Sequence, residues 1–112
     1  MPSTIAGCYA EIKRYQVLSS GVSNVISQLK SCSSNYLNLK KNIQENYLVN
    51  NDTTPVYDKV STLESEADKT SNYLSNTILP AIASAIQALY RRIAELEEEE
   101  RRAREREEAN EN

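Results

Sequence analysis

Apolar residues recur at helical spacing along the first half of the chain. From Leu18 to Ile43 the intervals between them alternate between four and three residues, which is the pattern of a helix that lays one narrow stripe against another helix. We predict a helix over residues 5–48, with Ser3 or Thr4 as its N-cap. Its predicted seam consists of Leu18, Val22, Val25, Leu29, Cys32, Tyr36, Leu39 and Ile43.

A short polar segment, VNNDTTP at residues 49–55, then interrupts the pattern. Asn and Asp favour turns, Thr54 suits an N-cap, and Pro55 suits the first helical position because it has no amide hydrogen to leave unpaired. We predict a second helix over residues 55–105, and the short connection predicts antiparallel packing of the two helices. The fold class is therefore an all-α, two-helix hairpin. The predicted seam of the second helix includes Val56, Val60, Leu63, Ala67, Thr70 and Leu74.

The heptad spacing slips just before Pro80. Two successive intervals of four residues, from Leu74 to Ile78 and on to Ile82, replace the alternation of four and three. Proline removes one backbone hydrogen bond and crowds the carbonyl group four residues earlier. We therefore predict a kink near Pro80 within a continuing helix, the alternative being a new helix that begins at Pro80.

The segment around and after Pro80 has an apolar face that covers an arc of roughly 140°, wider than one neighbouring helix can bury. A lone hairpin also has only one seam with which to offset the entropy of ordering its chain. We expect a partner to cover the rest of this face and complete a four-helix bundle, the partner being a second copy or another helical protein. The predicted partner-binding residues are Ile78, Leu79, Ile82, Ile86, Leu89, Tyr90 and Ile93.

The charges divide the chain into a hairpin, residues 1–96, and a charged helical tail, residues 97–112. Residues 1–80 carry seven basic and seven acidic side chains, and residues 81–112 carry six and nine, which accounts for the formal charge of -3. Glutamate-first pairs four residues apart, such as Glu98 with Arg102, support an exposed helix in the tail. The chain has no clustered basic face of the kind that binds nucleic acid.

The sequence offers no constellation for catalysis, and we predict neither an enzyme nor a cofactor or metal site. It contains no histidine and only two glycines, which excludes a Ser/His/Asp triad and a glycine-rich phosphate loop. Cys8 and Cys32 both fall on the apolar pattern of the first helix. They are interpreted as buried thiols, the alternative being an intermolecular disulfide in a symmetric dimer.

Targeting signals are also absent from the pattern. The N-terminus lacks the basic start and apolar core of a secretory signal, and the longest apolar stretch, at residues 78–89, is too short and too polar to span a bilayer. We therefore expect a cytoplasmic protein without membrane insertion, with any export following a route that needs no cleaved signal.

A hairpin of about 100 residues with a polar loop near its midpoint and a face for a second hairpin resembles the WXG-type small proteins of bacterial type VII secretion. It is similar in particular to the WXG-like partners of LXG toxins. The chain has no Trp-x-Gly turn, and Ala94 stands where the Tyr-x-x-x-Asp/Glu signal after Tyr90 would need an acidic residue. The resemblance implies an accessory, chaperone-like or targeting subunit that binds the N-terminal helical domain of a toxin. The alternative is a homo-oligomeric structural coiled coil.

Overall fold

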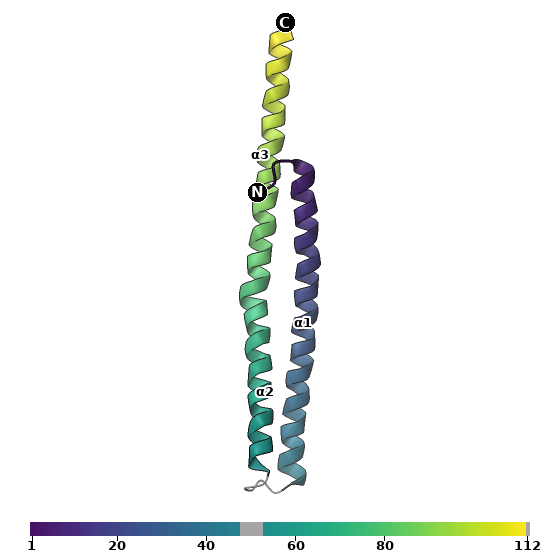
Figure 1. Cartoon of the computed structure of the whole chain (residues 1–112), viewed down its shortest axis with the longest axis vertical. Helices are drawn as coiled ribbons and strands as arrows, with labels where there is room; N and C mark the ends of the chain where they lie inside the picture. Colours follow the sequence, from purple (N-terminus) through teal and green to yellow (C-terminus); the bar gives the residue numbers. More distant parts are fainter. Residues whose placement is uncertain (48–52, 112) are drawn as a thin grey trace. The chain divides into compact units, whose positions relative to one another are not determined.

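The computed structural model of the protein describes residues 1–47 and 53–111. Regular structure in these two ranges is entirely helical, which confirms the prediction of an all-α chain (Figure 1). The predicted end of the first helix at Leu48 and the predicted turn at residues 50–52 lie outside the described residues. The elements in chain order are α1 (Ile5–Asn46), α2 (Thr54–Tyr73), the π-helix η1 (Leu74–Ile78) and α3 (Leu79–Glu111).

A side-chain cap fixes the start of α1. The hydroxyl of Thr4 accepts a hydrogen bond from the backbone N–H of Gly7 at 3.0 Å, and the carbonyl of Thr4 accepts one from Cys8 at 3.0 Å. Thr4, one of the two predicted candidates, is therefore the N-cap. Gly7 is needed here, because a Cβ atom at this position would lie 2.9 Å from the Thr4 hydroxyl and 3.2 Å from the Cβ of Pro2.

The start of α2 differs from the prediction by one residue. Thr54 is already helical, and Thr53 is the N-cap residue, whose carbonyl accepts the Tyr57 N–H at 3.1 Å. Pro55 lies in the first turn, as its sequence position predicted. Proline is tolerated there because the first N–H groups of a helix have no partner within the helix.

The slip in spacing before Pro80 takes the form of a π-helical turn. The N–H of Leu79 bonds to the carbonyl of Leu74, five residues earlier, and α3 follows η1 without a gap. A π-helical turn contains one more residue than an α-helical turn. It therefore accommodates the one residue by which the two successive intervals of four exceed the heptad spacing.

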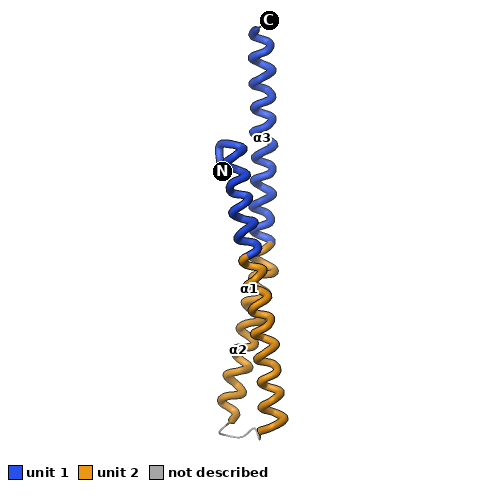
Figure 2. Tube along the Cα trace, turned by 90° about the vertical axis from the view of Figure 1, so that its right-hand side faces the viewer, with its two compact units in different colours: residues 1–20, 80–112 blue, residues 21–79 orange. Residues whose placement is uncertain are grey.

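The chain divides into two compact units (Figure 2). Unit 1 comprises Met1–Ser20 and Pro80–Asn112, and unit 2 comprises Gly21–Leu79. Unit 1 pairs the first part of α1 with α3, and unit 2 pairs the rest of α1 with α2 and η1. Each unit has its own seam, and the two seams differ in chemistry.

Unit 1 has an apolar core. Five side chains of α1 and α3 form a cluster, in which Cys8 is 0% and Leu89 2% exposed. The N-terminal lead-in is attached to the same core, because the Nε–H of Arg92 donates to the carbonyl of Pro2 at 3.3 Å. The cluster consists of Cys8, Ile12, Leu89, Ile93 and Leu96, with Ile5, Tyr15 and Ile86 packed against it.

Beyond Leu96 the tail is helical and exposed up to Glu111, apart from the half-buried Glu98. Glu98 pairs with Arg102, as predicted, at 3.1 Å. It also pairs with Arg101, and Arg101 in turn pairs with Glu105. These hydrogen bonds, chiefly that from Arg101, lower the pKa of Glu98 to about 2.

Unit 2 has a mixed seam. Ile26, Ile43, Val60 and Ala67 are buried, and so is Ser71, whose hydroxyl is a buried side-chain polar atom without a hydrogen-bond partner among the described residues. Half-buried Ser33, Lys40 and Glu64 complete the contact between the helices. Fewer large apolar side chains are therefore fully buried in unit 2, where they are Ile26, Ile43 and Val60, than in unit 1, where they are Ile12, Ile82, Leu89, Ile93 and Leu96.

Alternate members of the predicted seam lie outside the contact between the helices. Val22, Leu29, Tyr36 and Leu74 are half-buried, and Ile43 and Val60 are buried. The residues between them are exposed because a neighbouring stripe, which contains Ile26, Ser33 and Lys40, faces α2 instead. A shift of one residue turns a side chain by about 100° around the helix. The predicted seam residues that are exposed are Leu18, Val25, Cys32, Leu39 and Leu63, together with Val56 and Thr70.

Candidate interaction surface

Hydrogen bonds between the two helices of unit 2 define its polar side. The hydroxyl of Ser33 donates to Asp68 at 2.6 Å, and the amide of Gln44 donates to the hydroxyl of Tyr57 at 3.0 Å. Higher numbers on α1 pair with lower numbers on α2, so the helices are antiparallel. The bonds also fix which turns of the two helices lie at the same level.

Lys40 and Glu64 form an ion pair in the same seam. The distance from Lys40 Nζ to Glu64 Oε1 is 3.0 Å, and the two side chains are 18% and 17% exposed. The ammonium group also lies 5.5 Å from the centroid of the Tyr57 ring, where a cation is attracted by the aromatic face. The hydrogen bond to Glu64 is the main reason that the pKa of Lys40 is raised.

Large apolar side chains remain exposed on both helices of unit 2. Val25 and Leu39 of α1 are 43% and 46% exposed, and Val56 and Leu63 of α2 are 56% and 38% exposed. Cys32, midway between Val25 and Leu39, is a free and exposed thiol. We call the set Val25, Cys32, Leu39, Val56 and Leu63 the apolar face.

Helical geometry places these five residues on the same side of unit 2. Each of them immediately precedes a seam residue, as Leu39 precedes Lys40 and Leu63 precedes Glu64. Seen end-on, residue numbers run clockwise around one helix and counterclockwise around its antiparallel partner. The seams of the two helices also face in opposite directions, each toward the other helix. The same offset on two antiparallel helices therefore points to the same side of the pair. Asp68 and Gln44, which immediately follow seam residues, mark the other side.

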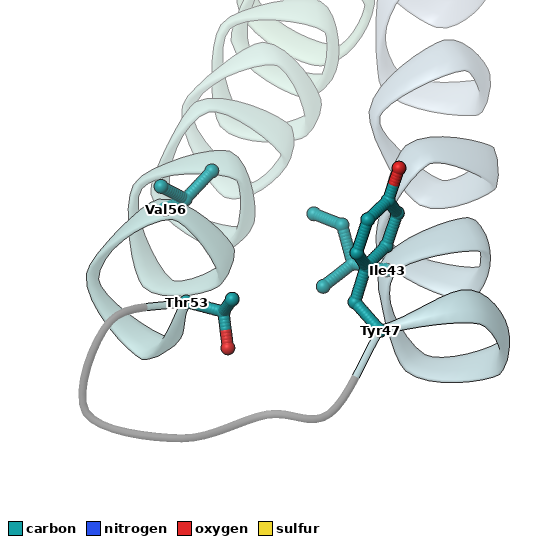
Figure 3. A pocket seen from close by; sticks show the side chains of 4 residues that line it. All are labelled: Ile43, Tyr47, Thr53 and Val56. Carbon is teal, nitrogen blue, oxygen red and sulfur yellow. The ribbon is translucent and has the colours of Figure 1, made fainter.

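A hollow of about 200 Å³ lies at the end of this face near the connection between the helices (Figure 3). Ile43 and Thr53 point toward one another across it, while Tyr47 and Val56 complete its lining. Val56 belongs to the apolar face, and Ile43 is a buried residue of the seam beside it. The hollow therefore extends the apolar face at this end of unit 2.

The residues that we predicted for partner binding around Pro80 are partly used inside the chain. Ile82, Leu89 and Ile93 are buried within unit 1, where Leu89 and Ile93 belong to its core. Ile86 is half-buried against the same core, whereas Tyr90 remains 43% exposed. Ile78 and Leu79 of unit 2 are half-buried. The prediction gave these residues to a partner while expecting one neighbouring helix to bury part of the arc, and the first turns of α1 pack against the part that contains Ile86, Leu89 and Ile93.

The five residues of the apolar face were all predicted as members of the seams inside the hairpin, and the sequence reasoning missed that they face away from the contact between the helices. The available signal was polar: Ser33 and Lys40 recur at heptad spacing on α1, as do Tyr57 and Glu64 on α2. Burying a polar group is costly unless it is hydrogen-bonded. Polar groups that form hydrogen bonds across a seam can therefore occupy it in place of apolar residues. Matching these two polar series would have indicated which stripe faces inward.

The predicted thiols occupy different environments. Cys8 is buried in unit 1, as expected, but Cys32 is exposed in unit 2, contrary to the expectation for both. Among residues 1–47 and 53–111 no group of three or more acidic or cysteine side chains is placed to hold a metal ion. Within the same ranges no helix is long and apolar enough to cross a membrane.

Comparisons with known proteins add no relative: no family model matches the chain, and neither the curated proteins nor the solved structures contain a match.

Proposed function

We propose that this protein is a non-enzymatic binding subunit that docks another helical protein on its apolar face. The observation that supports the proposal is the arrangement of unit 2: the hydrogen bonds of Asp68 and Gln44 lie on one side, and the exposed Val25, Leu39, Val56 and Leu63 lie on the other. Leu37 is the exposed leucine on the hydrogen-bonded side. Exposed apolar side chains that gather on one side of a domain are typical of interaction sites. An apolar stripe at heptad spacing is suited to a partner helix, whose own stripe can interdigitate with it.

The resemblance to the WXG-like partners of LXG toxins supports a more specific role. In that role the protein would be an accessory, chaperone-like or targeting subunit, and its partner would be the N-terminal helical domain of such a toxin. The pairing would form in the cytoplasm before any export. Two helical hairpins that join their apolar faces would complete a four-helix bundle, the assembly that a single hairpin with one seam leaves incomplete.

Co-expression with the N-terminal helical domain of an LXG toxin tests the proposal. Leu63→Glu should abolish co-purification, because it places a charge in the centre of the apolar face. Leu37→Glu is the matched control: Leu37 is 42% exposed, but it immediately follows Tyr36 and therefore lies on the polar side. Equal capture by the wild type and both variants would contradict the proposal, as would capture by none of the three.

A further inference from the structure

We propose that, in the absence of another partner, a second copy of this chain covers the apolar face, with α1 of each copy packed against α2 of the other. This inference rests on the proposed function, because it assigns an occupant to the same face. A different helical partner would bind by replacing the second copy in this dimer. Its evidence lies in the size of the face, in the charges around it and in the register of the two helices.

The face is large enough for a stable dimer. The part of α1 in unit 2 runs from Gly21 to Asn46, a length of about 39 Å at 1.5 Å per residue. Two packed helices are about 20 Å wide, so the side of unit 2 has a footprint of about 800 Å². Specific interfaces bury about 800 Å² on each partner. One copy therefore offers the area that a standard interface needs.

The charges around the face do not oppose a second copy. Between Arg14 and Lys40 the only charged residue is Lys30. Lys30 immediately follows Leu29, which places it on the polar side of unit 2 together with Asp68 and Gln44. The α1 half of the face therefore has no charge that a like copy would repel.

The rims of the two helices are complementary rather than alike. The outer edge of the face on α1 carries three exposed amides, Gln28, Asn35 and Asn42. The corresponding edge on α2 carries Lys59, Glu66 and Tyr73, which are exposed as well. An amide donates to a carboxylate or phenol oxygen and accepts from an ammonium group, so each amide can satisfy any of these three side chains.

The hydrogen bonds of the hairpin set the register of the dimer. Ser33 lies level with Asp68 and Lys40 with Glu64, so Leu39 lies level with the turn that contains Leu63. If the two copies are related by a two-fold axis along the helices, these levels are kept. Leu39 then meets Leu63 of the other copy, and Cys32 meets Thr70. In the same register the amide rim pairs as Gln28 with Tyr73, Asn35 with Glu66 and Asn42 with Lys59.

Packing α1 against α1 of the second copy is less favourable. That arrangement runs the two α1 helices antiparallel and buries the stripe fully only when Cys32 meets Cys32 of the second copy. In this arrangement the α2 helices of the two copies are displaced along the helix axis. Val56 then lies opposite a point of the second copy beyond Leu79, the last residue of unit 2. The exposed valine would lie outside the contact between the two apolar faces.

Sedimentation equilibrium of the full chain between 1 and 100 µM tests the inference. We expect a dimer for the wild type and for Leu37→Glu, and a dissociation constant raised by at least about 30-fold for Leu39→Glu. Both substitutions place the same residue near the end of α1, and circular dichroism checks that both variants retain their helix content. A monomer at 100 µM, or equal weakening by both variants, overturns the inference.

Oxidation under non-reducing conditions tests the register. Thr70→Cys should form a covalent dimer through Cys32, while the wild type should form none, because its two Cys32 thiols lie on diagonally opposite helices. A covalent wild-type dimer overturns the register. A monomeric wild type that still captures the LXG helical domain, with capture lost in Leu63→Glu, refutes the dimer and leaves the proposed function intact. A dimer that forms as expected in a chain that captures no helical domain refutes the function alone.

Discussion

Unit 1 and unit 2 are both antiparallel helix pairs, but they bury different side chains. Unit 1 closes over a cluster in which Cys8, Ile12 and Leu89 are at most 3% exposed. Unit 2 places Ser33, Lys40 and Glu64 in its seam and leaves Leu39 and other apolar residues exposed. The difference lies in what the two helices place between them: unit 1 buries a cluster of apolar side chains, whereas unit 2 shares its seam between apolar and hydrogen-bonded polar groups. Exposed apolar side chains occur in both units, since Val17 and Leu18 of unit 1 are 67% and 50% exposed.

Truncation of one leucine in each unit should give the largest contrast. Leu89→Ala removes a side chain that is 2% exposed and should lower the free energy of unfolding by about 2–5 kcal/mol. Leu63→Ala removes one that is 38% exposed and should cost less than about 1 kcal/mol. Urea unfolding at a chain concentration at which no dimer is populated measures both. Equal losses would show that Leu63 is buried as fully as Leu89.

Much of this architecture follows from the sequence. The two long helices, the antiparallel connection in unit 2, the Thr4 cap and the irregularity before Pro80 all follow from local spacing and capping chemistry. These features depend on residues that are close in sequence. Their energetics are decided within one or two helical turns.

The choice of stripe in unit 2 could not be made by apolar spacing alone. The heptad series that begins at Val25 continues with Cys32 and Leu39, whereas the series from the adjacent Ile26 continues with Ser33 and Lys40, so apolar spacing selects the stripe that the structure leaves exposed. What decides between them is the opposite helix, whose Glu64 and Asp68 meet Lys40 and Ser33. Such pairing joins residues that are 24 and 35 positions apart. A pattern read along one helix at a time does not contain this information.

Thiol reactivity should separate the two units by a large factor. Cys32 is exposed and Cys8 is completely buried, so a disulfide reagent should modify Cys32 rapidly and Cys8 only after unfolding, a difference of about 100-fold or more in rate. Cys32→Ser and Cys8→Ala assign the two phases. If the second copy covers the apolar face, the fast phase should slow as the chain concentration rises. Two thiols with the same rate would contradict the contrast between the units.

Loss of the N-terminal cap should weaken unit 1 by about 1 kcal/mol. Thr4→Ala removes the hydroxyl that accepts the Gly7 N–H, whereas Ser3→Ala, at the preceding exposed residue, serves as the control. Urea unfolding of the two variants compares them directly. If Ser3→Ala were the more destabilising of the pair, the cap would have been assigned to the wrong residue.

Replacing the buried serine of unit 2 should stabilise the protein slightly. The Ser71 side chain is 3% exposed and its hydroxyl has no hydrogen-bond partner among the described residues, so Ser71→Ala removes an unpaired polar group. Ser65→Ala, at an exposed position of the same helix, shares the gain in helix propensity. We expect Ser71→Ala to exceed Ser65→Ala by up to about 1 kcal/mol in the free energy of unfolding, measured by urea titration. A loss on Ser71→Ala relative to this control would mean that the hydroxyl has a partner.

The smallest effects on stability should come from changes of pH. Acid pH should weaken the tail of unit 1, and alkaline pH should weaken the seam of unit 2. The pKa of Glu98 is lowered from 4.5 to about 2 by its hydrogen bonds to Arg101 and Arg102. The stabilisation of the α3 tail is therefore complete above pH 4.5 and is lost as the pH falls from 4.5 toward 2.

The pKa of Lys40 is raised above 10.5, chiefly by its hydrogen bond to Glu64. The stabilisation of the unit 2 seam is therefore complete below pH 10.5 and is lost as the pH rises through the raised pKa. Circular dichroism of the wild type and Glu98→Gln follows the acid limb, and urea midpoints of the wild type and Lys40→Met follow the alkaline limb. Each variant should flatten only its own limb. The acid limb should also diminish in high salt, because the Glu98 pairs are open to solvent whereas Lys40 and Glu64 are mostly covered.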